Sequence, residues 1–241
     1  MQKLIPPENG TTLKGTLDSG RWKILARVFF DAPPEHVARA LLGKILLHHL
    51  DGALLAGRIV ETEAYLGEHD PAAHAASGRT ARNAVLYGPP GRAYVYHIYG
   101  MHQCLNVSCL PSGVPGCVLL RALEPLAGTS QMQRNRGLRT NARLDELTSG
   151  PGKLCQALGI TRVSDNARDL TDRDSPLGLY DDGFQCGEIL VGPRIGIRKA
   201  ADLPLRFFLA GHAYVSAGGR KQNIVDQSRS PDIRGKGKQR A

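Results

Sequence analysis

Apolar residues occur in short runs separated by turn-forming residues, which is the pattern of a strand-rich domain. Ile45–Leu50 and Leu54–Tyr65 flank Asp51-Gly52, a dipeptide typical of tight hairpin turns. Ala93–Tyr99 and Gln103–Cys109 form a second pair across a short Gly-containing turn. We therefore predict two antiparallel strand pairs, followed by strands over Gly116–Leu123, Glu188–Ile197 and Leu205–Ala210.

Helical patterns are fewer. Asp31-Ala-Pro-Pro precedes Glu35–Leu42 and Gly43 follows it, so a polar residue, first-turn prolines and a closing glycine delimit a helix. Shorter helices are predicted over Thr129–Arg136 and Lys153–Leu158. Because strands and helices do not alternate regularly, we predict an α+β class: a single mixed domain whose mostly antiparallel sheet is flanked by helices.

The 241 residues suffice for one such domain, which we place at residues 21–217. Residues 1–20 are expected to form a flexible arm, and residues 218–241 a basic, disordered tail without core-forming side chains. Residues 66–92 are rich in Gly, Pro, His and Arg and predict a long loop with one short helix. A loop of this length in a compact domain is more often functional than idle.

The net charge of the chain indicates what kind of partner it binds. The net charge is +9 and the pI about 9.5, which suits a polyanion such as nucleic acid, although much of the excess lies in the tail. Five cysteines form no CxxC pair, an odd count that favours reduced thiols. Without a signal-like or membrane-length apolar stretch, we expect a soluble, intracellular protein that binds no membrane.

Two acids and a tyrosine alternate along one predicted strand. Because successive strand side chains point to opposite faces, Glu61, Glu63 and Tyr65 share a face. Carboxylates are rarely buried unless they are paired or used, so this strand is a candidate catalytic floor. On this segment alone the alternative is favoured, in which both glutamates face solvent.

A second cluster of polar and aromatic residues follows. Tyr94, Tyr96 and Tyr99 lie within six residues and either pack across strands or stack on nucleobases. Asn106 lies in mid-strand and either lines a pocket or hydrogen-bonds the backbone. Arg121, after an apolar run, is either a surface charge or a fork for phosphate or carboxylate.

Metal and cofactor motifs are weak or absent. His69 and His74 flank Asp70, but their spacing matches neither HExxH nor a cysteine-based zinc site. No phosphate-binding glycine motif, nucleophile elbow or zinc-deaminase signature occurs. We therefore predict no metal site and no cofactor.

Several of these segments together resemble one family. Their order and spacing from about Phe29 to about Ser216 are similar to those of the alkyladenine (3-methyladenine) DNA glycosylases. The matching blocks are Gly57-Arg-Ile-Val-Glu-Thr-Glu-Ala-Tyr-Leu-Gly67, Asp70-Pro-Ala-Ala-His74, Tyr94-Val-Tyr-His-Ile-Tyr-Gly100, Cys104-Leu-Asn106, Val118-Leu-Leu-Arg-Ala-Leu-Glu-Pro125 and Ser149-Gly-Pro-Gly-Lys-Leu-Cys155. The resemblance implies a curved antiparallel sheet and excision of alkylated or deaminated purines without metal or cofactor.

The resemblance also implies a role for each candidate residue. Glu63 would be the general base that activates water, and Arg121 would hold that water and the adjacent phosphate. The flipped base would lie among Tyr65, His74 and Tyr96. The remaining roles concern selection and flipping: Asn106 would reject the exocyclic amine of guanine, and Tyr99 would be the wedge that replaces the extruded nucleotide in the duplex. No lysine falls among these positions, which favours a water nucleophile over a Schiff-base lyase step.

The chain departs from the family pattern at His97 and His102-Gln103, where apolar or aromatic residues are expected. The partner implied is double-stranded DNA containing damaged purines, bound by a monomer in a bacterial cytoplasm or a nucleus. Two alternatives remain from the residues alone. One is a metal-dependent nuclease that uses Glu61, Glu63, His69 and His74, and the other is a non-catalytic nucleic-acid-binding module.

Overall fold

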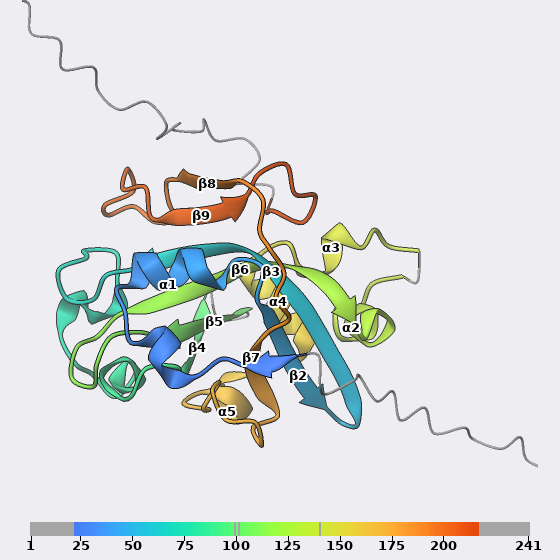
Figure 1. The fold of residues 1–241 in the computed structure, drawn as a ribbon, viewed down its shortest axis with the longest axis horizontal. Coiled ribbons are helices and arrows are strands. Elements are labelled where there is room, and N and C mark those ends of the chain that lie inside the picture. The colour runs from blue at the N-terminus through green and yellow to red at the C-terminus, as the bar shows by residue number, and fades with distance from the viewer. Residues whose placement is uncertain (1–21, 99, 101, 140, 217–241) are drawn as a thin grey trace, which may run out of the picture.

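The described strands pair into one antiparallel sheet that curls into a half-barrel (Figure 1). The computed structural model describes residues 22–98, 100, 102–139 and 141–216. The strands are β1 (Lys23–Ile24), β2 (Ile45–Leu50), β3 (Ala53–Tyr65), β4 (Ala93–Ile98), β5 (His102–Ser108), β6 (Cys117–Ala127), β7 (Leu177–Asp181), β8 (Ile189–Gly192) and β9 (Arg206–Leu209). Their order is β1-β7-β2-β3-β6-β5-β4, and β9 joins β3 to β8. The predicted α+β class is confirmed.

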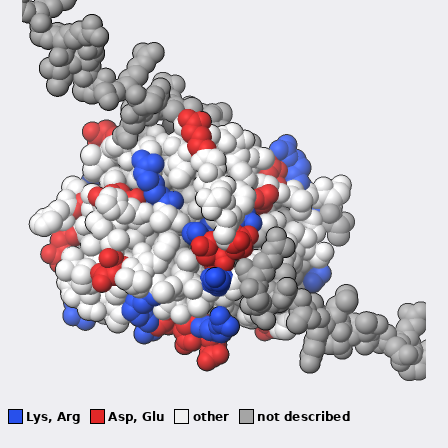
Figure 2. Space-filling model, viewed as in Figure 1, with Lys and Arg blue, Asp and Glu red and all other residues white. Residues whose placement is uncertain are grey.

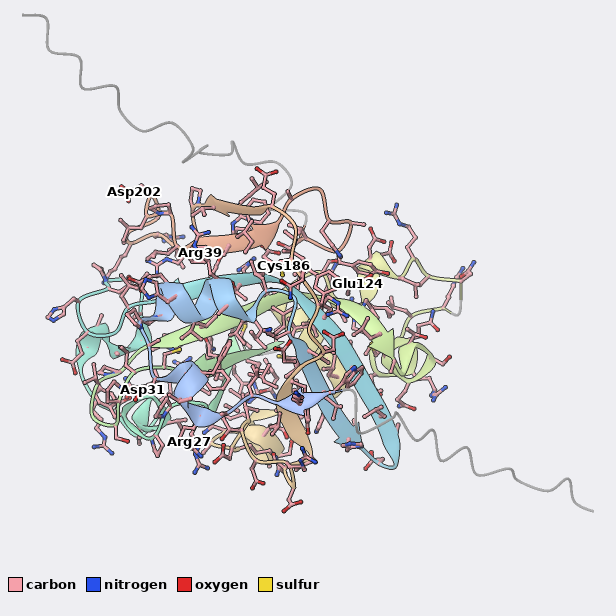
Figure 3. The ribbon with its side chains drawn as sticks, in the orientation of Figure 1. Arg27, Asp31, Arg39, Glu124, Cys186 and Asp202 are labelled. Atoms are coloured by element: carbon pink, nitrogen blue, oxygen red, sulfur yellow. The ribbon has the colours of Figure 1, made fainter. Side chains whose placement is uncertain are left out.

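Short helices surround this sheet. They are α1 (Pro34–Leu41), α2 (Thr129–Asn135), α3 (Asp145–Thr148), α4 (Pro151–Leu158) and α5 (Arg162–Asp165), together with the 3-10 turns η1 (Arg27–Phe30), η2 (His74–Ser77) and η3 (Ala84–Tyr87). The buried face of α1 carries Val37, Ala38 and Leu41 and packs against β3 and β6. Arg39, on the outer side of α1, stands 5.0 Å from the ring centroid of Phe207 on β9 (Figure 3). The helix thus covers the sheet where β3 and β9 meet.

The long strand β3 is the centre of the fold. It pairs with β6 along most of its length, with β2 over Ala53–Arg58 and with β9 over Glu61–Glu63. Register shifts against β6 occur between Ile59 and Thr62, where β3 changes its other partner. Because bulges bend a strand and increase its twist, they account for the curl of the sheet at this point. Both faces of β3 are consequently covered.

Several predicted bounds differ from the observed ones. The strand predicted to end at Leu123 continues through Pro125 to Ala127, because β3 extends opposite it. Proline has no backbone N–H to donate to a neighbouring strand, and the register shift at Ala56/Gly57 accommodates Pro125 at this point. The strand predicted over Glu188–Ile197 stops at Gly192, directly before Pro193. β1 and β7 were not predicted. The predicted arm (1–20) and tail (218–241) lie outside the described residues.

The predicted long loop after β3 is present, but it contains two 3-10 turns, η2 and η3, instead of one helix. Buried Asn83 fixes its shape by donating to the carbonyls of His74 (3.0 Å) and Gly78 (2.9 Å) and accepting from the amide of Thr80 (2.7 Å). Asp70 forms a two-point ion pair with Arg194 in the loop after β8 (Nη2 to Oδ1, 2.9 Å), and both side chains are fully buried. The two loops are therefore tied together.

Acidic and basic side chains are interspersed on the face seen in Figure 2, with no large area of one sign. Among the described residues, no helix has both the length and the apolar character needed to cross a membrane.

The buried pair of Asp70 and Arg194 yields a stability prediction. Burial opposes ionisation of Asp70, but the hydrogen bonds and charge of Arg194 outweigh it, and the pKa of Asp70 lies below its usual range. Asp70→Ala leaves the buried guanidinium of Arg194 without its carboxylate partner. It should therefore lower the free energy of unfolding by about 3–5 kcal/mol at pH 7. Because the pKa is depressed on folding, this loss should shrink as pH falls through it.

Urea denaturation at several pH values measures this loss. The control is Arg143→Ala, which removes an ion pair whose arginine side chain is 73% exposed and should leave the free energy of unfolding almost unchanged. Equal losses for the two variants would show that Asp70 and Arg194 do not clamp the loops.

Candidate active site

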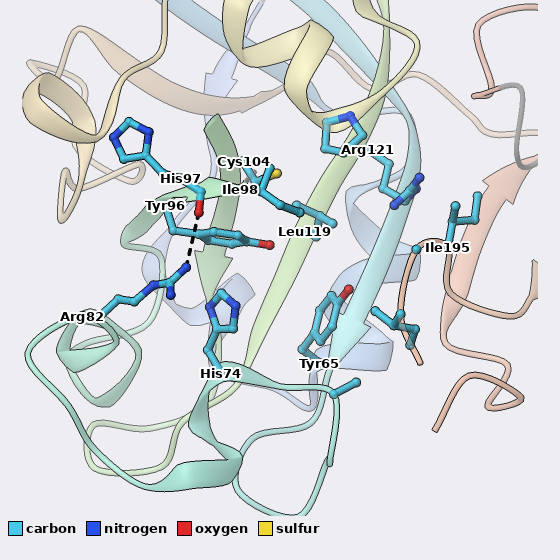
Figure 4. Close-up of a pocket in the computed structure, with 14 residues that line it drawn as sticks. Tyr65, His74, Arg82, Tyr96, His97, Ile98, Cys104, Leu119, Arg121 and Ile195 are labelled. Carbon is cyan, nitrogen blue, oxygen red and sulfur yellow. Dashed lines mark hydrogen bonds between the residues drawn. The ribbon is translucent and has the colours of Figure 1, made fainter. Parts of the chain in front are cut away.

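A cavity of about 490 Å³ opens on the inner side of the curled sheet, within the size range of small-molecule sites (Figure 4). Four predicted site residues line it: Tyr65, His74, Tyr96 and Arg121. They come from β3, the loop after it, β4 and β6, so the sheet topology brings together residues distant in sequence. The start of α4 at Pro151 and the loop 195–197 complete the wall.

Glu61 and Glu63 are both fully buried. The alternative that placed them in solvent is therefore wrong. The opposite face of β3 is no less covered, since the hydroxyl of Thr62 donates to the carbonyl of Ala38 in α1 (2.9 Å). Periodicity assigned the two glutamates correctly to one face. It could not show that β9 and the loops around it cover that face as well.

Glu63 lies directly behind the cavity wall and contacts three of its residues. Oε1 accepts a hydrogen bond from the amide of Ile195 (2.7 Å), and Oε2 accepts one from the hydroxyl of Tyr65 (3.0 Å). Nη1 of Arg121 forms an ion pair with Oε1 at 3.1 Å. Burial raises the pKa of Glu63, and the charge of Arg121 and the two hydrogen bonds only partly offset this rise. Among the described residues Tyr65 is the one hydrogen-bond donor to Oε2, so this oxygen retains a lone pair for a further donor.

Arg121 lies between the two buried glutamates. Its Nε donates to Oε1 of Glu61 (3.1 Å), while its Nη1 lies 3.1 Å from Oε1 of Glu63. Burial opposes ionisation of the guanidinium, but the two carboxylates outweigh it and raise the pKa of Arg121. The residue is thus a fixed cation at the end of the cavity, and the surface-charge alternative for it is wrong.

Three aromatic side chains form the cavity wall. The rings of Tyr65 and Tyr96 stand on either side of it, and the ring of His74 meets Tyr96 edge-on at a centroid distance of 4.4 Å (Figure 4). Burial raises the pKa of Tyr65 and of Tyr96, so both phenols stay protonated. Desolvation and the charge of Arg82 lower the pKa of His74, which favours a neutral imidazole. Its Nδ1 lies 2.8 Å from the hydroxyl of Tyr94.

Tyr94 and Asn106 lie deeper than the lining residues. Tyr94 is buried in a small apolar cluster, which fits the packing alternative for this residue. The amide of Asn106 donates to the carbonyl of Tyr94 (3.3 Å), and its Oδ1 lies 3.7 Å from the thiol of Cys117. Asn106 therefore sits beneath the cavity. Tyr99, the predicted wedge, lies outside the described residues.

Sequence reasoning missed most of the other lining residues, among them Arg82, Cys104, Leu119 and Ile195. Cys104 could have been found, because it lies opposite Tyr96 in the predicted hairpin of β4 and β5. Ile195 acts through its backbone amide, and no sequence signal marks such a donor. Arg82 donates to the carbonyl of His97 (3.4 Å) and stands 5.5 Å from the ring centroid of Tyr96. Because Arg82 lies in a loop, the sequence did not indicate that it contacts β4.

The four residues of the nuclease alternative do not come together as metal ligands. Glu61 and Glu63 are occupied by Arg121, and His74 faces Tyr94. Within the described residues, His, Cys, Asp and Glu form no group of three or more able to hold a metal ion.

Comparison with known proteins agrees with this arrangement. Residues 28–213 match the family model of methylpurine-DNA glycosylases. A protein of Koribacter versatilis is 57% identical over 192 residues, which cover 80% of this chain and 92% of the relative. Proteins of Methanoculleus marisnigri (49% identical; 80% of this chain, 98% of the relative) and Burkholderia lata (47%; 81% and 93%) are also similar. All three carry the name "Putative 3-methyladenine DNA glycosylase". The matched segment contains the whole cavity, and the chain belongs to the methylpurine-DNA glycosylase family.

Proposed function

We propose that this protein is a monofunctional DNA glycosylase that excises alkylated or deaminated purines from double-stranded DNA, using a water activated by Glu63. The observation that carries the proposal is the buried carboxylate of Glu63 behind an aromatic cavity, where burial raises its pKa. A base with an elevated pKa is better matched to proton abstraction near neutral pH. The family description and the names of the relatives favour methylated purines as substrates.

A purine inside a duplex cannot reach such a cavity, so the damaged nucleotide must be flipped out. We place the flipped base between Tyr65 and Tyr96, with His74 at its edge, because aromatic faces stack on nucleobases. Asn106, beneath the cavity, is proposed to reject the exocyclic amine of normal guanine. Tyr99 is proposed as the wedge that fills the vacated position in the duplex. Flipping costs least for damaged or mispaired bases, which adds to selectivity.

The proposed reaction is hydrolysis of the N-glycosidic bond. The water oxygen attacks the anomeric carbon while the purine leaves with the bonding electron pair, and Glu63 accepts the water's proton on the open site of Oε2. The sugar acquires oxocarbenium character, which a nearby carboxylate stabilises. Arg121 would hold the water and the adjacent phosphate. None of the described residues that line the cavity is a lysine, which supports a water nucleophile over a covalent lyase step.

Glu63→Gln tests the assignment of the base. The amide keeps the size of the side chain but cannot take a proton from water, so single-turnover excision should fall by about 10²-fold or more with lesion binding retained. Excision from a duplex carrying 3-methyladenine analogues, hypoxanthine or ethenoadenine is measured as alkali-revealed abasic sites. Glu68→Gln, the same change at an exposed acid in the neighbouring loop, should excise at the wild-type rate. Excision by Glu63→Gln within a few-fold of wild type would remove Glu63 from this role.

The elevated pKa of Glu63 predicts a pH dependence. Excision requires ionised Glu63, so its rate should rise with pH through a pKa above the usual range of a glutamate. Tyr65→Phe removes a hydrogen bond that stabilises the carboxylate and should move this rise to still higher pH. Tyr96→Phe is the control, because its hydroxyl is not among the donors to Glu63 and the rise should stay in place. Single-turnover rates between pH 4 and 9 measure the shift, and its absence in Tyr65→Phe would contradict the assignment.

Chelation separates glycosylase from nuclease. The guanidinium of Arg121 occupies the position between Glu61 and Glu63 that a metal ion would need. We expect base excision to persist in excess EDTA, with an intact phosphodiester backbone before alkali treatment. A loss of activity that added divalent metal restores would support the nuclease. Lesion binding without any release of free base would support the non-catalytic module.

A further inference from the structure

Glu61, the other acid of β3, is the centre of a buried network that reaches the cavity only through Arg121. Its Oε1 accepts from Nε of Arg121 (3.1 Å), Nη1 of Arg206 (3.3 Å) and the hydroxyl of Ser216 (3.1 Å). Its Oε2 accepts from the backbone amide of Ser216 (2.8 Å). Glu61 and Arg206 are fully buried, and Arg121 and Ser216 are each 6% exposed.

Burying these charged side chains carries a large desolvation cost. Desolvating charges costs several kcal/mol per ion, and apolar residues of similar volume often stabilise a fold as well or better. Glu61 accepts four hydrogen bonds from described residues, and of their donors only Arg121 lines the cavity. Glu63, by contrast, is hydrogen-bonded by two residues of the cavity wall, Tyr65 and Ile195. Glu61 is therefore poorly suited to bind water or substrate, and its contacts indicate a role exerted through a neighbour.

Arg121 is that neighbour. A guanidinium is planar and its donors are fixed in a fork, so fixing Nε also fixes the direction in which the terminal nitrogens point. Glu61 holds Nε, and Nη1 then faces Glu63 at 3.1 Å. Ser216 and Arg206 in turn hold Glu61, so segments around β9 reach Glu63 through two intermediate side chains.

We propose that Glu61 is a positioning residue, which holds the guanidinium of Arg121 against Glu63 and so keeps the water-activating carboxylate in its reactive geometry. This inference rests on the function proposed above.

Glu61 acts on Glu63 in two opposite ways, which makes its role measurable. Its own negative charge raises the pKa of Glu63, whereas the charge of Arg121 lowers that pKa and is the larger influence. If Glu61 acts by holding Arg121, its loss should raise the pKa of Glu63. If it acts only as a neighbouring charge, its loss should lower that pKa.

The test is Glu61→Gln in the full chain, assayed by single-turnover excision from a lesion-bearing duplex. The donors from Arg121 and Ser216 now share the two carboxylate oxygens of Glu61. Glutamine offers them one acceptor oxygen, so Arg121 or Ser216 must lose its partner. We expect the rate to fall about 10- to 100-fold, as for a displacement of about 1 Å at a reacting group, with lesion affinity within about threefold of wild type. The rise of rate with pH should move to higher pH.

A double-mutant cycle shows whether the effect passes through Arg121. In an Arg121→Met background, Glu61→Gln should change the remaining rate by less than about twofold, because the group it positions is gone. Thr62→Val is the matched control: it removes a buried hydrogen bond from the same strand on the opposite face. It should lower the melting temperature without changing the excision rate or its pH dependence. Should Glu61→Gln not fold, Ser216→Ala, which removes one donor to Glu61, should give a two- to fivefold fall with a pH shift in the same direction.

Three results would overturn the inference. The first is a rise of the Glu61→Gln rate that occurs at the same pH as in wild type or at a lower one. The second is that the effects of Glu61→Gln and Arg121→Met on the rate are additive. The third is a Glu61→Gln rate within twofold of wild type. In each case Glu63→Gln would still abolish excision, so the proposed function would stand. A wild-type protein that excises no lesion would overturn the proposed function, and this inference with it.

Discussion

The guanidinium of Arg121, held between two buried carboxylates of one strand, is the interaction on which the site depends. Glu61 and Glu63 are two residues apart on β3, so their side chains project from the same face into the protein. Two like charges this close in a medium of low dielectric repel each other and resist ionisation. Arg121 contacts both carboxylates, and its positive charge opposes that repulsion. The strand can carry two buried acids because β6 supplies this cation and β9 supplies a second one, Arg206, to Glu61.

The curl of the sheet provides the surroundings that this arrangement needs. A flat antiparallel sheet commonly leaves one face to solvent, and the two glutamates would then have been ordinary surface residues. The register shifts of β3 let it leave β2 and pair with β9, which brings the loops around residues 195 and 216 over the acids. Backbone amides from these loops supply donors that the strand itself cannot. Burial then raises the pKa of Glu63, while Arg121, Ile195 and Tyr65 limit the rise.

The two glutamates differ although they share a strand face. Glu63 adjoins the cavity and keeps an open acceptor position, which is the requirement for a group that takes a proton from water. Glu61 accepts four hydrogen bonds from described residues, and of their donors only Arg121 lines the cavity. The chain belongs to the methylpurine-DNA glycosylase family, so the proposed reaction in which the two acids differ is the excision of a base from DNA. In the proposed reaction one acid works on the substrate and the other holds the residue beside it.

The sequence by itself determined the class of fold, the main strands and helices, and the residues that share the cavity face. Hairpin turns, helix-limiting prolines and glycines, and strand alternation act over a few residues, so they can be seen in a short window. They correctly located β2 to β5 and placed Glu61, Glu63 and Tyr65 on one face. Block order over most of the chain indicated the family, which the comparisons then showed.

Only the tertiary structure decided which of these residues are buried and what they contact. The donors to Glu61 and Glu63 include Ile195, Arg206 and Ser216, more than 130 residues away along the chain. Two of these contacts use backbone amides, which every residue except proline possesses and which therefore leave no mark in a sequence. Burial of an acid depends on what covers a strand face, and a local pattern records only which residues share that face. The raised pKa of Glu63 is consequently a result of long-range packing.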